Sequence, residues 1–226
     1  MDPAELQTLI RAIEAKDLAT AAHTWRVVLY ARAMAEEGGL GRDRIERISI
    51  AAALHDVGKL DIPSAILQKP GKLTDEEFAV IQQHPVTGYA RMIKMDVEDE
   101  DILDLIRYHH ERVDGKGYPY GLAGDAIPVV ARYFAVIDTF DALTSIRPYR
   151  TEIGEDAAER ALVILSEGAG SAFAPEAVEL FTALYREQKI DHVLHYFNDE
   201  FPSPDFQIEQ VRQHERTDRR TDRRNA

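Results

Sequence analysis

Apolar side chains recur along most of this chain at the three- or four-residue spacing that one face of an α-helix requires. The first run lies in residues 6–13, and the second lies in residues 25–33 and stops at Gly38-Gly39. A third run, in residues 45–54, leads into His55 and is expected to end at Gly58. No segment shows a convincing alternation of apolar and polar positions, as a strand would. The pattern therefore predicts helices throughout.

Helix start and stop signals divide the rest of the chain. Thr74, with Glu77 three residues later, predicts a capping box that opens a helix. Pro85 and Gly88 place His84 at a break between two helical stretches. Further helices are predicted at residues 102–106, 128–143, 155–165 and 175–187, and a loop rich in glycine and proline at residues 114–121. The expected fold class is all-α.

Length and composition favour one domain. The chain has 226 residues, of which 45% are hydrophobic, and this is enough for a core. We predict a single domain over residues 1–200, including the N-terminal helix, and a polar tail over residues 201–226. The short charged repeat near the end of the tail, in residues 215–224, has the composition of a disordered segment.

Charge and targeting signals limit the cellular location and the ligands that we expect for this protein. No apolar run reaches the roughly 18 residues of a membrane span, and no secretory leader is visible. The absence of cysteine gives no sign of export, so we expect a cytoplasmic protein that does not bind a membrane. The net charge of −13 argues against a broad basic face for polymeric nucleic acid. A small phosphodiester stays open as a ligand, because bound metal ions would add local positive charge.

Seven imidazole and carboxylate side chains are the candidate metal ligands: His23, His55, Asp56, His84, His109, His110 and Asp138. They are too many for one tetrahedral zinc ion, and they suit two octahedral first-row ions with open positions for water and substrate. Asp56 is the natural bridge, because the two oxygens of a carboxylate can bind two ions. Two ions about 3.5–4 Å apart are the usual apparatus for hydrolysing a phosphodiester.

Each candidate also has a structural interpretation. A single histidine such as His23 or His84 more often lies at a surface or in a hydrogen bond than on a metal. His55-Asp56 follows an apolar run, where burial of ionisable groups is costly unless a partner compensates. Asp138 raises the same question, and a buried arginine is its structural alternative. The presence of all these groups together favours metal, whereas His192, His195 and His214 are interpreted as structural.

Three basic residues are candidates for contacts with a phosphate. Lys59 lies four residues after His55 and three after Asp56, so helical geometry places it on their side. We interpret it as a group that stabilises charge on the phosphate, rather than as a lysine at a helix end. Arg147 could bind phosphate or pair with a carboxylate such as Asp141, and the structural role is favoured for Arg150.

Four motifs follow one another along the chain. They are HDVGK at residues 55–59, HPVTG at 84–88, HHERVDGKGYP at 109–119 and DTFDALT at 138–144. This series resembles the HD-GYP subfamily of the HD phosphohydrolases, which are cyclic di-GMP phosphodiesterases of bacterial signalling. The resemblance covers roughly residues 23–175, and false matches at four spaced motifs are uncommon.

The resemblance implies an HD-domain helical bundle with a metal centre between the helices. One ion would be held by His23, His55, Asp56 and Asp138, and the other by Asp56, His84, His109 and His110. Some members carry a third ion, bound partly by a glutamate four residues before the first histidine. That position is Ala19 here, and Asp17 lies on a different helix face, so we expect two ions per chain. Iron or manganese is favoured, with nickel, cobalt and zinc as alternatives.

The resemblance also implies substrate contacts. Tyr118 of the Gly-Tyr-Pro triplet is intact, and with Lys59 and Arg147 it is expected to contact the substrate. Ile146 stands where many relatives carry aspartate, which bears on how Arg147 is oriented. Asp56 and Lys59 are the residues expected to act in catalysis.

The implied reaction is hydrolysis of cyclic di-GMP to the linear dinucleotide or onward to GMP, by a hydroxide that bridges two ions. Another cyclic dinucleotide such as cyclic GMP-AMP, or a nucleotide, is the alternative substrate. A non-catalytic cyclic dinucleotide receptor and a di-iron oxygenase of the same fold also stay open as functions. A regulatory protein or a diguanylate cyclase is a candidate partner.

Overall fold

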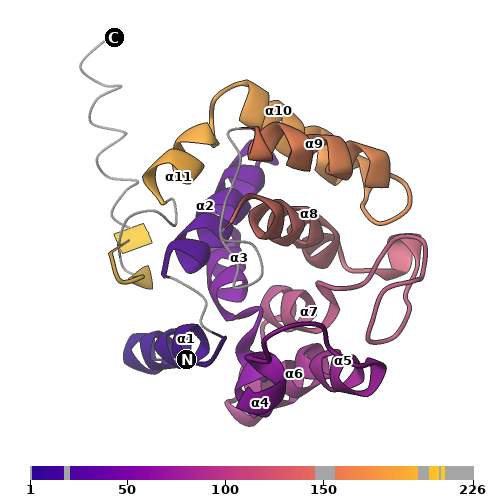
Figure 1. Ribbon diagram of the computed structural model, residues 1–226. Helices are drawn as coiled ribbons and strands as arrows, with labels where there is room; N and C mark the ends of the chain where they lie inside the picture. Colours follow the sequence, from indigo (N-terminus) through magenta and orange to yellow (C-terminus); the bar gives the residue numbers. More distant parts are fainter. Residues whose placement is uncertain (1, 18–20, 146–155, 198–203, 209, 212–226) are drawn as a thin grey trace.

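The computed structural model describes residues 2–17, 21–145, 156–197, 204–208 and 210–211 (Figure 1). These residues form helices α1 (Pro3–Asp17), α2 (Ala21–Glu37), α3 (Arg42–Leu54), α4 (Ser64–Leu67), α5 (Asp75–Ile81), α6 (His84–Lys94), α7 (Glu100–Tyr108), α8 (Val129–Thr144), α9 (Ala157–Gly168), α10 (Pro175–Arg186) and α11 (Asp191–Tyr196). Two short 3-10 helices are η1 (Val57–Asp61) and η2 (Gly124–Ala126). Within these residues there is no strand, only two isolated β-bridges, so the predicted all-α class is confirmed.

Helix α8 lies at the centre of the molecule. It packs against α2, α7, α9 and α10, which surround it in Figure 1. Phe134, Val136, Ile137 and Phe140 of α8 are each at most 2% exposed. A helix that is apolar on most sides belongs in the interior, because each side can then be covered by another helix. The carboxylates that α8 carries are therefore placed within the helical bundle.

The start signals of α5 and α6 lie where the sequence predicts them. The Thr74 side chain accepts a hydrogen bond from the Glu77 backbone, and the Glu77 carboxylate accepts one from the Thr74 backbone. This capping box satisfies two N–H groups that the first turn of α5 would otherwise leave unpaired. His84 is the first residue of α6, with Pro85 next to it, as expected for a break between two helices.

The predicted end of the third helix is wrong. Helix α3 ends at Leu54, and Gly58 lies within η1. Gly58 instead permits close packing of η1 against α6, because a Cβ atom at this position would lie 1.9 Å from the His84 carbonyl oxygen and 2.6 Å from the Gly88 nitrogen. The glycine thus brings the segment after His55-Asp56 directly against the start of α6, where His84 lies.

Part of the segment assigned to the polar tail packs on the helices. Phe206, Ile208 and Val211 are buried, and the Phe206 ring contacts Trp25 of α2 with 4.8 Å between centroids. The Trp25 indole donates a hydrogen bond to the Pro204 carbonyl over 2.9 Å. The charged repeat at residues 215–224 lies outside the described residues. None of the described helices has the length and apolarity needed to cross a membrane.

Candidate metal centre

The structure brings the seven candidate ligands to one place. His23, His55 and Asp56 form one group, and His84, His109 and His110 form the other. Within each group, the atoms that could bind a metal all lie within 4.8 Å of one another. Asp138 joins the first group, since its Oδ1 lies 3.9 Å from His55 Nε2. That these residues bind metal stays a prediction.

Asp56 lies between the two groups. Its Oδ2 is 3.2 Å from His55 Nε2, and its Oδ1 is 3.3 Å from His84 Nε2. Each carboxylate oxygen therefore faces a different group of histidines. A carboxylate in this position can contact two ions at once, which is the arrangement expected of a bridging ligand.

Backbone carbonyls set the tautomer of three of the histidines. Nδ1 of His55 lies 2.8 Å from the Ala52 oxygen, and Nδ1 of His84 lies 2.8 Å from the Ile81 oxygen. Nδ1 of His109 lies 3.0 Å from the Ile106 oxygen. A carbonyl oxygen only accepts, so each Nδ1 must carry the proton and donate it. In the neutral rings Nε2 is then left with a lone pair, as a metal ligand requires.

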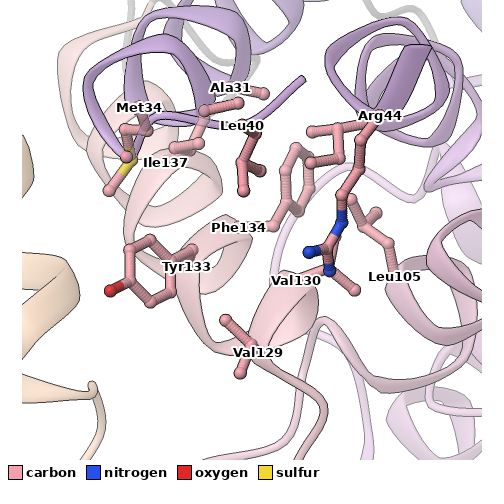
Figure 2. A pocket seen from close by; sticks show the side chains of 13 residues that line it. Ala31, Met34, Leu40, Arg44, Leu105, Val129, Val130, Tyr133, Phe134 and Ile137 are labelled. Atoms are coloured by element: carbon pink, nitrogen blue, oxygen red, sulfur yellow. The ribbon is translucent and has the colours of Figure 1, made fainter. Parts of the chain in front are cut away.

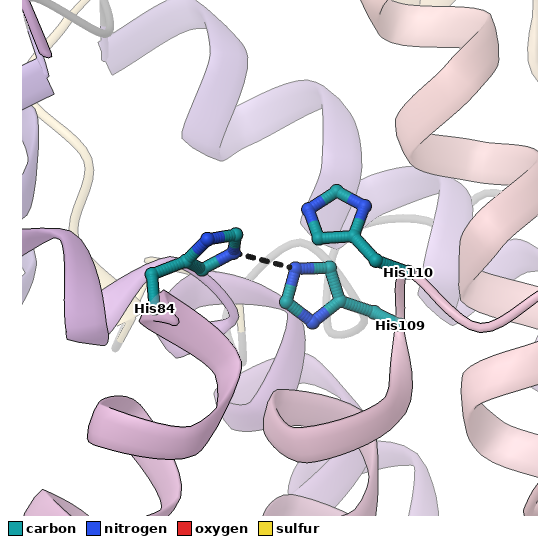
Figure 3. A group of neighbouring side chains, drawn as sticks. All are labelled: His84, His109 and His110. Carbon is teal, nitrogen blue, oxygen red and sulfur yellow. Dashed lines mark hydrogen bonds between the residues drawn. The ribbon is translucent and has the colours of Figure 1, made fainter. Parts of the chain in front are cut away.

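Two of these lone pairs face each other. His84 and His109 approach with 3.2 Å between their Nε2 atoms, the contact drawn as a dashed line in Figure 3. Burial lowers the pKa of His84 to about 3 and that of His109 to about 4, so both rings are neutral at pH 7 and neither Nε2 has a proton to donate. Two nitrogens bound to one ion at about 2.1 Å would lie about 3.0–3.4 Å apart for octahedral to tetrahedral angles. The observed spacing fits a shared cation.

The pKa of His55 is raised, in contrast to those of His84 and His109. Burial alone would lower the pKa of His55, but the Asp56 carboxylate outweighs it and, with Asp138, raises that pKa to about 9. Burial would raise the pKa of Asp56, yet His55 and Lys59 hold it well below its usual range. The negative charges of Asp56 and Asp138 thus favour a cation at this position, and the His55 proton provides one.

Asp141 orients His23 from within α8. Its Oδ2 accepts a hydrogen bond from His23 Nδ1 over 2.7 Å, and its other oxygen pairs with Arg26 Nε. The Asp141 side chain is fully buried and that of Arg26 is 1% exposed. Although burial opposes ionisation, Arg26 and His23 hold the pKa of Asp141 far below its usual range. A carboxylate that accepts from the second nitrogen of a histidine is a common support for a metal ligand.

The buried arginine considered for Asp138 belongs instead to Asp141. Asp138 is 22% exposed and faces His55. The partner of Asp141 is Arg26, whereas Arg147 and Arg150 lie outside the described residues, as do Ile146, Ala19 and His214. The signal for Arg26 was present in the sequence, because it lies three residues after His23 and hence on a neighbouring part of the same helix face.

Lys59 and Tyr118, which are predicted to contact the substrate, lie beside the candidate ligands. Lys59 Nζ lies 2.7 Å from Asp56 Oδ2, so it reaches the expected side of the ligand pair. The Tyr118 ring stacks on His110 at 4.6 Å, and burial together with the Asp56 charge raises its pKa. His192 and His195 are exposed on α11. The expected substrate contacts of Lys59 and Tyr118 stay predictions.

Glu111 holds the glycine-rich loop, a role that the sequence did not indicate. This carboxylate is 3% exposed and accepts hydrogen bonds from the backbone of Tyr120 at 2.7 Å and Leu122 at 2.9 Å. Gly117 allows the loop to approach closely, since a Cβ there would lie 2.4 Å from the Arg112 nitrogen. Together they keep Tyr118 against His110.

Two pockets lie near the centre. A groove of about 450 Å3 is lined by His109, His110 and Asp138 among others, so it opens onto the candidate ligands. A second pocket, of about 170 Å3, is lined mainly by apolar side chains of α2, α3 and α8 (Figure 2). Phe134 lines the second pocket and also contacts the His55 ring, with 5.0 Å between centroids. Phe134 therefore separates the apolar pocket from the ligand groups.

Comparison with known proteins identifies related sequences. A family model described as HD domain matches residues 7–177. The "cyclic di-GMP phosphodiesterase response regulator RpfG" of Xanthomonas campestris is 44% identical over 77% of this chain and 46% of its own length. A "cyclic di-GMP phosphodiesterase" of Thermotoga maritima is 37% identical over 84% of this chain and 53% of its own length. A "3'3'-cGAMP-specific phosphodiesterase 2" of Vibrio cholerae is 38% identical over 76% and 33%.

Solved structures share the fold. A Bdellovibrio bacteriovorus protein described as "Bd1817, a HDG"Y"P protein" superposes with a TM-score of 0.57 and 19% identity, covering 73% of this chain and 51% of that one. The V-cGAP3 phosphodiesterase of Vibrio cholerae, described as specific for cyclic GMP-AMP, gives a TM-score of 0.61 and 16% identity, covering 86% and 51%. This chain thus spans about half the length of these structures.

Proposed function

Because the chain belongs to the HD domain family, we propose that it is a metal-dependent phosphodiesterase that hydrolyses cyclic di-GMP. The observation that carries the proposal is the position of Asp56, with one oxygen facing His55 and the other facing His84. The names of similar proteins, which are cyclic di-GMP and 3'3'-cGAMP phosphodiesterases, support the substrate class. The product would be the linear dinucleotide or GMP.

Two divalent ions are the proposed cofactors, with iron or manganese favoured over nickel, cobalt and zinc. One would be held by His23, His55, Asp56 and Asp138, and the other by Asp56, His84, His109 and His110. Such ions supply an acidified water as the nucleophile and polarise the phosphoryl oxygens. The mixed nitrogen and oxygen donors suit these metals.

The chain's own residues position the reacting groups. The carbonyls of Ala52, Ile81 and Ile106 hold three imidazoles with Nε2 toward the centre. Lys59 carries positive charge beside Asp56, where it would stabilise charge that develops on the phosphate. The Tyr118 ring stacks on His110 at the wall of the groove, where it would contact the substrate. Arg147 is proposed as a further phosphate contact.

Cyclic GMP-AMP is the second candidate substrate, because a relative that is 38% identical is named as specific for 3'3'-cGAMP. The test is to incubate purified protein of known metal content with cyclic di-GMP, 3'3'-cGAMP and cyclic di-AMP, and to separate the products by chromatography. We expect the linear dinucleotide or GMP from cyclic di-GMP, and no product with Asp56→Asn. Tight binding without product would establish a receptor instead.

We further propose a cytoplasmic setting, a regulatory protein or diguanylate cyclase as partner, and no binding of polymeric nucleic acid. The net charge of −13 supports the last point, since binding of a nucleic acid polymer relies on clustered positive charge.

A further inference from the structure

The groove beside the candidate ligands has a second, aromatic region. Ring contacts lead from His110 to Tyr118, at 4.6 Å, and from Tyr118 to Phe78 of α5, at 6.4 Å. Phe78 lines the same groove as His110 and Asp138, and its volume of about 450 Å3 is within the range of about 300–1,000 Å3 that is common for small-molecule sites. A ligand bound at the metal ligands could therefore reach Phe78.

The packing of α5 does not require an aromatic side chain at Phe78. None of the residues Asp75–Ile81 is buried, and the helix is held by its capping box and by a Lys69–Glu77 ion pair of 2.6 Å. Phe78 is 47% exposed. Single exposed apolar residues are common, and Val80 on the same helix is 37% exposed. The difference is that Phe78 lines the groove and Val80 does not.

The groove also offers polar groups at its lining. Gln82, Lys116 and Thr139 take part in it together with Phe78. Among the described residues, the Lys116 ammonium forms no ion pair, and the Lys116 backbone donates to Asp114 Oδ1 over 3.1 Å, which holds the loop in place. A flat aromatic face with nearby hydrogen-bond donors and acceptors matches the chemistry of a nucleobase, which presents a π-face and a polar edge.

We propose that this groove binds a purine nucleobase of the substrate, stacked on Phe78. The inference rests on the proposed function, in which a phosphodiester lies at the metal ligands, because the base attached to that nucleotide must then occupy space next to the centre. Phe78 would act in binding and not in the chemical step. Removing an aromatic platform typically weakens binding of a base by roughly 5- to 160-fold.

The test compares a nucleotide with its base-free counterpart. Binding of GMP and of ribose 5-phosphate to the full chain in the presence of Mn2+ is measured by calorimetry for wild type, Phe78→Ala, Phe78→Trp and the matched control Val80→Ala. In the wild type, GMP should bind at least about fivefold more tightly than ribose 5-phosphate. Phe78→Ala should abolish most of this difference, whereas Phe78→Trp and Val80→Ala should keep it.

Two results would overturn the inference. One is a wild type that does not distinguish GMP from ribose 5-phosphate, including a wild type that binds neither. The other is a difference in affinity that persists in Phe78→Ala. Circular dichroism of each variant checks that α5 and the remaining helices are formed. Failure of the proposed function would be seen separately, as a wild type that binds GMP in this way but does not hydrolyse any cyclic dinucleotide.

Discussion

Single atoms determine what the candidate centre can bind. His55 and His84 each donate Nδ1–H to a carbonyl one turn earlier in the chain, so the local backbone decides that Nε2 faces Asp56. Asp56 in turn presents one oxygen to each of them. In an Asp56→Asn variant, an NH2 group would replace one of the two carboxylate oxygens. This hydrogen-bond donor would face a region that is suited to cations.

A substitution at Lys59 can separate a role in stabilising the substrate from a role in binding metal. Its ammonium lies 2.7 Å from Asp56 Oδ2 but has no lone pair for a metal. Lys59→Ala should keep the metal content near that of the wild type and lower kcat by about 10²–10³-fold, with a smaller change in KM, because the contact would strengthen in the transition state. Metal analysis and steady-state kinetics on one preparation test this. Unchanged kcat would mean a lysine without a catalytic role, and lost metal would mean a structural support.

Asp114 gives a pH-dependent prediction at the start of the glycine-rich loop. Arg112 binds both of its oxygens, at 3.0 and 2.7 Å, and this pairing lowers the pKa of Asp114 from 3.8 to about 2. Because the folded pKa is lowered, the pair is fully formed above about pH 4 and is lost as the pH falls through about 2. In Arg112→Gln the pKa of Asp114 should move back toward 3.8, as measured by carboxyl NMR titration. A pKa that stays near 2 would show that the loop backbone, rather than Arg112, sets it.

At the scale of helices, a network of buried charged groups and hydrogen bonds links α2, α8 and α11. Arg26 of α2 pairs with Asp141 of α8, donates to Ser145 Oγ at 2.6 Å, and donates to the Phe197 carbonyl at 2.6 Å, next to α11. His23 donates to the same carboxylate. The arrangement connects the orientation of a candidate ligand to the packing of three helices.

Removing one charge of this network should destabilise the whole fold. Asp141→Asn leaves the buried Arg26 without its counter-charge, so the free energy of unfolding should fall by about 3–5 kcal/mol. The double variant Arg26→Met/Asp141→Leu removes both charges and should recover much of that loss. Urea denaturation with EDTA present measures the three proteins without metal. A double variant as unstable as Asp141→Asn would show that the charges themselves are needed.

For the molecule as a whole, the sequence predicted the elements that show a periodic apolar pattern and the site residues that belong to a motif. Helical spacing indicated most of the longer helices, since each buries one apolar face, and the motifs indicated the residues that meet at the centre. Short elements such as α4 and α11 were missed, because four to six residues carry too little periodicity. The roles of Arg26 and of the groove wall at Phe78 were also missed, since they depend on contacts between segments that are far apart in the chain. Glu111 was missed because it binds backbone N–H groups of an irregular loop 9 and 11 residues later, and such a loop has no periodicity that would indicate the contact.

The candidate metal ligands are distributed over the whole bundle, and this leads to the last prediction. His23 lies on α2, His84 on α6 and Asp138 on α8, while His55-Asp56 follow α3 and His109-His110 follow α7. Ions that bind only this folded arrangement must stabilise it by mass action. At a free metal concentration of 100 times the dissociation constant, the gain from each bound ion is about 2.7 kcal/mol, or roughly 5–11 °C in the unfolding midpoint.

Thermal unfolding with Mn2+ or Fe2+ under anaerobic conditions, against EDTA, measures this gain independently of any enzymatic activity. Asp56→Asn should lose most of the shift, because the carboxylate between the two histidine groups is then neutral. Asp96→Asn is the matched control, since Asp96 is exposed and its backbone φ of 55° is one that asparagine tolerates. It should keep the full shift. A midpoint that does not respond to metal, or that responds equally in both variants, would contradict a metal centre built around Asp56.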